Sequence, residues 1–271
     1  MNAVTPMPRY GIREQIQSET ALDTASESLR LLGYAIVDGG YDAGQLARFS
    51  DAFDGALAKL YAKYGLEALA AMDEQNTIRI LMQMDPLFLE LAMNANVLEI
   101  CKRLIGGTIV LNQQNGVVNP PLGARYNQGA YHRDLPYQHF VSTRPLAINA
   151  LFCLDQFTTD NGATFVVPAS HKQEAFPSDL SLPGFQVQVA APAGSFIVLD
   201  CMVYHVGGVN RTAKPRRAVN HVYTIPLIKQ QISLPTALGE DFTQDRATRS
   251  LLGYDFQVPI DVEHYYGSRQ R

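Results

Sequence analysis

The chain has 271 residues, of which 46% are hydrophobic and 18% are charged, and its net charge is −4. This balance is typical of a globular protein with a full core, and it gives no reason to expect nucleic acid or an anionic membrane surface as a partner. Three widely separated cysteines, no secretory signal and no apolar run long enough to span a membrane predict a reducing, cytoplasmic location.

The first part of the chain, up to residue 107, has a mostly helical pattern. Leu22, Ala25 and Leu29 recur at helical intervals, Asp42 is suited to cap a helix, and Gly65 is suited to end it. The predicted elements are a helix, a short strand, a long helix and a pair of helical segments, over residues 19–33, 34–40, 42–65 and 85–107.

After residue 107 the pattern changes to short β-type runs separated by turn residues. The predicted strands cover residues 108–119, 146–157, 163–170, 185–194, 195–200 and 217–227. Strands at this spacing favour a sandwich or barrel, and the absence of alternating long helices disfavours a parallel doubly wound sheet. We therefore expect a single α+β domain over residues 1–271, in which a helix-rich layer (1–107) packs on an antiparallel β core (about 108–228). The segment 229–271 has no clear assignment.

A possible metal site begins with the stretch GAYHRDLPYQHF, residues 129–140. On a strand, residues two apart point to the same side, so His132 and Asp134 would face one cavity and Arg133 would point away. His205 follows an apolar run, which we interpret as a strand that it ends, and a glycine pair comes after it. Two imidazoles and one carboxylate on one face form the facial triad of non-haem Fe(II) oxygenases, which leaves coordination positions open.

A chelating dicarboxylate would need a cationic partner for its second carboxylate, because a buried carboxylate without one is costly. Arginine fits this role because it pairs with both oxygens, and Arg216 and Arg217 begin the predicted strand after His205. Only one of these two arginines can point inward.

Other assignments stay open at this point. His139 and His221 could compete as metal ligands, although His221 lies inside a strand and is interpreted as a packing or hydrogen-bonding residue. A zinc hydrolase on a cupin-like barrel would also use His and carboxylate ligands. A barrel that binds a small molecule without chemistry is a third alternative.

Several stretches resemble the phytanoyl-CoA dioxygenase family of Fe(II)/2-oxoglutarate oxygenases. These are GAYHRDLPYQ, DNGATFVVPASHK, AGSFIVLDCMVYHVGGVNRTAKPRRA and, more weakly, LRLLGYAIVDGGYDAGQL, within residues 25–226. The resemblance implies a double-stranded β-helix (jelly-roll, cupin-like) core with helices packed on its major sheet. It also implies a dioxygenase that oxidises a C–H bond of a small organic metabolite, typically by hydroxylation, while 2-oxoglutarate and O2 become succinate and CO2.

The same resemblance implies roles for individual residues. His132, Asp134 and His205 would bind Fe(II), and Arg216, eleven residues after His205, would bind 2-oxoglutarate. Polar residues on nearby strands would help to hold this cosubstrate, for which we select Gln113, Asn119 and Asn149. Because related halogenases replace the carboxylate ligand with a small residue, the presence of Asp134 argues for hydroxylation or a related oxidation and against halogenation.

The chain departs from the family pattern at two positions. Ala169 replaces glycine in a PGSH turn, which would be unfavourable if that position is left-handed, and Gly207 stands where a hydroxyl residue is sometimes found. The substrate is not fixed by the sequence, and neither is the oligomeric state, for which a homodimer is one option. A pocket with aromatic rings and one or two polar anchors would suit a medium-sized organic molecule, and its lining could include Tyr131, Tyr137, Phe140, Arg79, Met82 and Met84, which could equally be core or surface residues.

Overall fold

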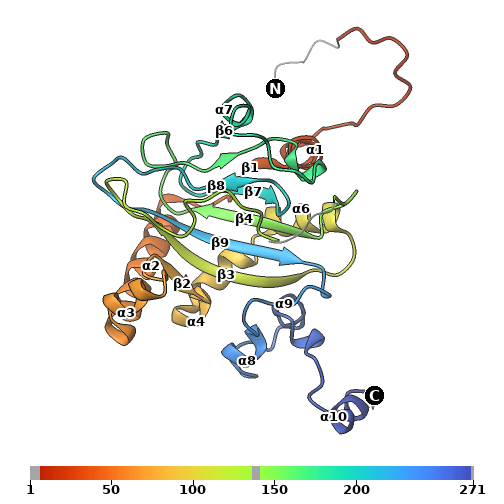
Figure 1. Cartoon of the computed structure of the whole chain (residues 1–271). Helices are drawn as coiled ribbons and strands as arrows, with labels where there is room; N and C mark the ends of the chain where they lie inside the picture. The colour runs from red at the N-terminus through yellow and green to blue at the C-terminus, as the bar shows by residue number, and fades with distance from the viewer. Residues whose placement is uncertain (1–6, 136–140, 270–271) are drawn as a thin grey trace.

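The computed structural model describes residues 7–135 and 141–269 (Figure 1). The strands are β1 (Tyr34–Asp38), β2 (Thr77–Arg79), β3 (Val110–Asn119), β4 (Ala147–Cys153), β5 (Phe165–Val166), β6 (Val187–Gln188), β7 (Ser195–Asp200), β8 (His205–Val206) and β9 (Arg216–Thr224). The α-helices are α1 (Ala21–Leu32), α2 (Ala43–Tyr64), α3 (Leu66–Ala71), α4 (Leu81–Met84), α5 (Leu89–Ala92), α6 (Ala95–Ile105), α7 (Leu182–Phe185), α8 (Leu234–Leu238), α9 (Arg246–Leu252) and α10 (Val262–Gly267). Short 3-10 helices cover Pro86–Phe88, Ser170–Lys172 and Tyr254–Phe256.

Two antiparallel sheets form the β core. The larger has six strands in the order β1-β7-β4-β9-β3-β2, and the smaller has three in the order β6-β5-β8. The helix-rich N-terminal part supplies both edge strands of the larger sheet, β1 at one edge and β2 at the other. This architecture of a large helix-covered sheet and a small opposing sheet confirms the predicted α+β, cupin-like fold.

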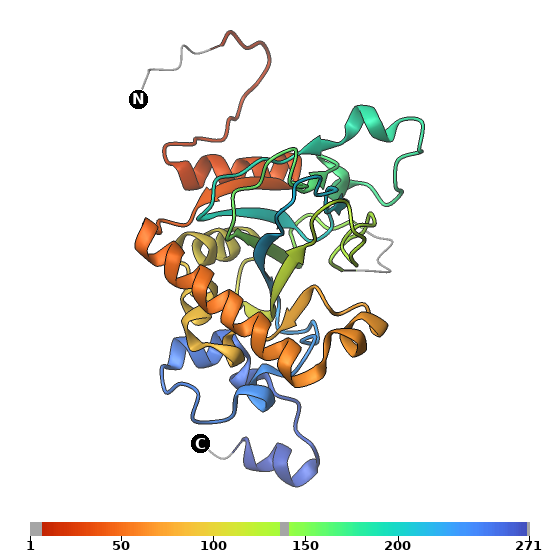
Figure 2. The same cartoon turned by 90° about the vertical axis from the view of Figure 1, so that its left-hand side faces the viewer.

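Helices α1, α2 and α6 lie together on one face of the larger sheet, and the small sheet and the loop around α7 lie on the other (Figure 2). Capping boxes begin α1 at Thr20 and α2 at Asp42, as the sequence predicts for Asp42. Along α2, Phe49 and Phe53 are fully buried against the sheet. Gly116 of β3 permits this close approach, since a Cβ there would lie 2.8 Å from Cε2 of Phe53.

The strands of the larger sheet have two different faces. On β3, Gln114, Gly116 and Val118 point toward the helices, where they join the main hydrophobic core or contact its residues. Gln113 and Asn115 alternate with them and point toward the opposite face. This alternation brings polar side chains of the larger sheet into the space between the two sheets, where a site can form.

The C-terminal segment, for which the sequence gives no assignment, forms short helices, and these helices differ in how far they pack into the core. Leu251 and Leu252 of α9 are buried in the main core, and the side chain of Gln230 donates to the carbonyls of Leu111 and Leu252. Helix α10 buries none of its residues and lies away from the sheets (Figure 1). No helix in the described ranges is both long and apolar enough to cross a membrane.

The strand predicted over residues 185–194 is largely wrong. The chain instead forms α7 up to Phe185 and then only the two-residue strand β6. A second correction concerns His205, which begins β8 of the small sheet, because the preceding strand β7 already ends at Asp200. The turn between the two strands carries the chain from the larger sheet to the smaller one.

Candidate functional site

His132, Asp134 and His205 converge at one end of the space between the sheets. The Oδ1 atom of Asp134 lies 3.9 Å from Nε2 of His132 and 3.7 Å from Nε2 of His205. One ligand atom from each of the three residues lies within 4.8 Å of the others. The three side chains therefore have the spacing that a single metal ion needs, although His205 lies far from the other two in the sequence.

The two imidazoles are oriented for metal binding by hydrogen bonds to the backbone. Nδ1 of His132 lies 2.8 Å from the carbonyl oxygen of Ala130, and Nδ1 of His205 lies 3.0 Å from that of Val203. A carbonyl accepts only, so Nδ1 carries a proton in each ring, and in the neutral form of the ring Nε2 presents its lone pair. Burial and the neighbouring His205 lower the pKa of His132, which favours the neutral imidazole that metal binding requires.

The carboxylate of Asp134 is held by Asn149. Nδ2 of Asn149 donates to Oδ2 of Asp134 at 2.7 Å, which leaves Oδ1 facing the two imidazoles. We selected Asn149 as a cosubstrate-binding residue, and the structure places its Nδ2 on the carboxylate while the residue also lines the adjoining pocket. Hydrogen bonds of this kind orient a ligand and are costly to remove.

The backbone brings the three residues together through an isolated bridge and not through a regular strand. His132 and His205 exchange two backbone hydrogen bonds of 3.0 and 3.1 Å, and the amide of Asp134 donates to Cys201. Arg133 points away from the pair, as predicted, and its guanidinium donates to the carbonyls of Met202 and Ser170. The buried Arg133 thus anchors the segment that carries His132 and Asp134.

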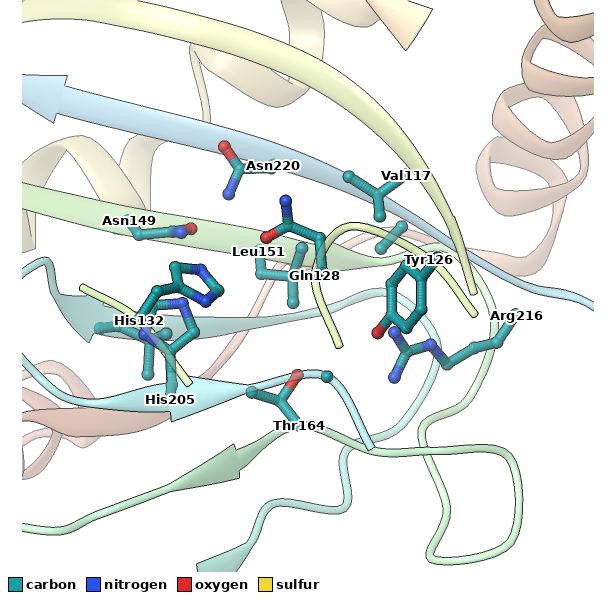
Figure 3. Close-up of a pocket in the computed structure, with 13 residues that line it drawn as sticks. Val117, Tyr126, Gln128, His132, Asn149, Leu151, Thr164, His205, Arg216 and Asn220 are labelled. Atoms are coloured by element: carbon teal, nitrogen blue, oxygen red, sulfur yellow. The ribbon is translucent and has the colours of Figure 1, made fainter. Parts of the chain in front are cut away.

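A pocket extends from the two histidines to Arg216 (Figure 3). His132 and His205 lie at one end, and Arg216 and Tyr126 lie at the other. The wall between them is lined by Val117, Gln128, Asn149, Leu151, Thr164, Leu199, Gly207, Ala218 and Asn220. The pocket therefore has a candidate metal centre at one end and a buried cation at the other.

Arg216 is 3% exposed and has no carboxylate partner among the described residues. Its Nη1 donates to the carbonyl of Gly162, its guanidinium carbon lies 3.8 Å from the ring centroid of Phe157, and its Nε is buried without a hydrogen-bond partner. Burial lowers the pKa of Arg216, and the phenol of Tyr126 opposes this effect. Such a cation fits an incoming carboxylate.

The neighbouring Arg217 has the opposite environment. It points to the other face of β9, where its guanidinium pairs with Asp155 and Asp54 at 2.8 Å each. These ion pairs and hydrogen bonds raise its pKa. As predicted, only one of the two arginines points inward, and it is Arg216.

Tyr126 occupies space that Gly207 leaves open. A Cβ atom at Gly207 would lie only 1.6 Å from the hydroxyl oxygen of Tyr126. That hydroxyl also interacts with Arg216. Tyr126 thus places a hydroxyl close to position 207, where the family sometimes has a hydroxyl residue. Nothing in the sequence indicated this role of Tyr126.

The remaining candidate residues are placed as follows. Gln113 lines a second pocket on the outer side of His132 and donates through Nε2 to Asn220 at 3.3 Å. Asn119 lies opposite Arg216 in the sheet register, but its Nδ2 donates to the carbonyl of Gly208 at 2.8 Å and it does not line the pocket that reaches Arg216. Asn220 faces that pocket and was missed, although its position four residues after Arg216 on the same strand places both side chains on one face.

The competing histidine His221 is fully buried on the helix-facing side of the sheet. Its Nε2 lies 2.9 Å from Nε2 of Gln114, and its Nδ1 lies 3.1 Å from the carbonyl of Ala150. This confirms that it is a packing and hydrogen-bonding residue. His139 lies outside the described residues.

The residues named as possible pocket lining, with core or surface as the equal alternative, are placed differently from one another. Arg79 lines the outer pocket, but Met82 is fully buried in the core, and Met84 packs against that core. Tyr131 packs its ring against Phe176 at a centroid distance of 5.1 Å. Tyr137 and Phe140 lie outside the described residues.

Comparison with known proteins agrees with this geometry. Residues 29–218 match the family model described as phytanoyl-CoA dioxygenase. The chain is 33% identical over 258 residues to the uncharacterized protein Rv1501 of Mycobacterium tuberculosis, with 93% of this chain and 94% of that protein covered. It is 29% identical over 170 residues to the dioxygenase af480 of Aspergillus fumigatus, which covers 58% of this chain and 52% of that protein.

Two solved structures show a similar fold. The first is EctD from S. alaskensis with 2-oxoglutarate and 5-hydroxyectoine, at 22% identity and a TM-score of 0.62, covering 77% of this chain and 79% of that one. The second is the non-heme alpha ketoglutarate dependent epimerase SnoN from nogalamycin biosynthesis, at 21% identity and a TM-score of 0.55, covering 75% and 80%.

Proposed function

Because this chain belongs to the phytanoyl-CoA dioxygenase family, we propose that it is an Fe(II)- and 2-oxoglutarate-dependent dioxygenase that hydroxylates an unactivated C–H bond of a small organic metabolite. In this reaction R–H, O2 and 2-oxoglutarate become R–OH, succinate and CO2. The observation that carries the proposal is one pocket that joins a His-Asp-His cluster to a buried arginine without a carboxylate partner among the described residues.

The cluster fits iron by its donor set. Two neutral imidazole nitrogens and one carboxylate oxygen are the ligands of the facial triad, and both rings present Nε2. His132, Asp134 and His205 would hold the metal, and Asn149 would keep the carboxylate of Asp134 in position. Bound iron, together with 2-oxoglutarate and O2, would supply the oxidising power that no amino-acid side chain provides.

Arg216 would bind the carboxylate of 2-oxoglutarate that lies farthest from the metal, with the hydroxyl of Tyr126 as a second donor. Its guanidinium is already desolvated and stacked on Phe157, so little reorganisation accompanies binding. A zinc hydrolase would have no use for this buried cation, and this argues for the oxygenase over that alternative. The apolar side chains of Val117 and Leu151 would restrict water between the two ends of the pocket.

The test is conversion of 2-oxoglutarate to succinate by purified protein supplied with Fe(II) and air. We expect slow succinate formation without added substrate, and none in His132→Ala or Asp134→Ala. Asp160→Ala, which removes an exposed carboxylate from a loop outside the pocket, is the matched control and should keep wild-type activity. Full activity in both ligand variants would end the assignment.

A further inference from the structure

The second pocket, on the outer side of His132 and Asp134, has a volume of about 290 Å³ and is lined mostly by residues with polar side chains. Its carboxamide side chains come from four separate parts of the chain, and Thr77 adds a hydroxyl. The carboxamides are Gln113, Asn115, Gln128, Asn220 and Gln231. Val117 is the one aliphatic side chain among the described lining residues, and none of those residues has a phenyl or phenol ring.

Arg79 lines this pocket, but an ion pair within the protein already neutralises its positive charge. Its guanidinium forms a two-point ion pair with Glu74, and its Nη1 donates to Oε1 of Gln231 at 3.0 Å. The guanidinium of Arg133 is directed away, to backbone carbonyls. A phosphate or carboxylate on the substrate would therefore have to displace an existing ion pair.

Several amide atoms face the pocket with no partner among the described residues. Gln113 donates through Nε2 to Asn220, which leaves Oε1 of Gln113 and Nδ2 of Asn220 available. Gln231 accepts at Oε1 from Nη1 of Arg79, which leaves its Nε2 available. Donors and acceptors are thus interspersed, and this pattern matches hydroxyl groups, each of which can donate and accept.

We propose that the substrate is a neutral polyhydroxylated molecule, namely a sugar or cyclitol ring, free or as part of a glycoside. The inference rests on the proposed function and names the substrate class for the same site. An apolar substrate would cover these amides without replacing their hydrogen bonds to water, and each amide atom left unsatisfied in this way would weaken binding. A site built to bind hydroxyls rejects analogues that lack them, often by several orders of magnitude.

The experiment measures succinate formed from 2-oxoglutarate above the substrate-free rate. The polyhydroxylated probes are myo-inositol and the methyl glycosides of glucose, galactose, mannose and rhamnose, and the comparators are phytanoyl-CoA and camphor. We expect at least one polyhydroxylated probe to raise the rate about tenfold, and neither comparator to do so. Stimulation by a comparator alone, or no stimulation by any polyhydroxylated probe, overturns the inference. If either result came with succinate formed in the absence of substrate, the proposed function would stand and only the substrate class would be refuted. If no succinate formed without substrate either, both the substrate class and the proposed function would be refuted.

A variant pair tests the role of the amides directly. Gln231→Leu should raise the KM for the stimulating probe about tenfold, as expected for one lost hydrogen bond. Gln156→Leu removes an exposed carboxamide that does not line the pocket and should leave this KM unchanged. Equal KM values in the two variants would contradict the assignment.

Discussion

Replacing Arg216 with methionine tests the proposed 2-oxoglutarate-binding end of the pocket without changing the candidate metal ligands at the other end. Arg216 is 3% exposed, and its contacts include the carbonyl of Gly162, the ring of Phe157 and the hydroxyl of Tyr126. Methionine keeps the apolar packing on Phe157 but removes the cation. The carbonyl of Gly162 still accepts a bond of 3.4 Å from Asn119, so the loop retains one donor.

The expected loss of affinity follows from the burial of the ion pair that Arg216 would form with 2-oxoglutarate. Removing one partner of a buried ion pair costs about 3–5 kcal/mol, and because this pocket is partly open we take the lower value. A loss of about 3 kcal/mol corresponds to roughly 100-fold weaker binding of 2-oxoglutarate. The affinity for the metal should stay unchanged, because Arg216 lies at the opposite end of the pocket from the histidines.

Isothermal titration calorimetry of 2-oxoglutarate, under anaerobic conditions with Fe(II) present, measures this effect. Arg217→Met is the matched control, since Arg217 is adjacent in sequence but pairs with Asp155 and Asp54 on the other face of the strand. The control should lose some stability and keep its affinity for 2-oxoglutarate. If Arg216→Met bound 2-oxoglutarate within threefold of wild type, the role of Arg216 would be refuted.

Three further predictions concern supporting residues. Ala169 has a left-handed backbone, φ 63°, so Ala169→Gly should relieve about 1 kcal/mol of strain and raise Tm by about 2–4 °C in calorimetry; a lower Tm would contradict this. Asn149→Leu removes the 2.7 Å bond to Asp134 and should weaken Fe(II) binding about 10- to 100-fold in a chelator competition, whereas unchanged affinity would show that the bond is dispensable. Burial lowers the pKa of His221 to about 4, so the unfolded chain takes up its proton first as pH falls below about 6.5. Unfolding free energy should therefore fall by up to about 3 kcal/mol between pH 6.5 and pH 4, and His221→Gln should flatten this slope; identical slopes would refute the assignment.

Much of the candidate metal site could be predicted because the sequence patterns that indicate it are local. His132 and Asp134 are two residues apart, and any extended segment directs such a pair to one side. Arg216 and Arg217 begin a strand, and alternation allows only one of them to face inward. These predictions depend on backbone periodicity, which a single sequence carries.

The parts that were missed depend on contacts between distant segments. Tyr126 reaches Arg216 only because Gly207, in another loop, has no side chain. Gln231 lines the outer pocket only because the chain after β9 turns back past β3. The same limit applies to Met82, which turns toward the core, because no local pattern distinguishes a core position from a pocket position there.

The central claim is that His132, Asp134 and His205 hold one metal ion, and Fe(II) stoichiometry tests it most directly. Protein reconstituted with Fe(II) under anaerobic conditions, then freed of loosely bound metal by gel filtration, should contain close to one iron per chain. Asp134→Ala and His205→Ala, checked for folding by circular dichroism, should contain almost none. Folded variants that each retained a full equivalent of iron would contradict the account.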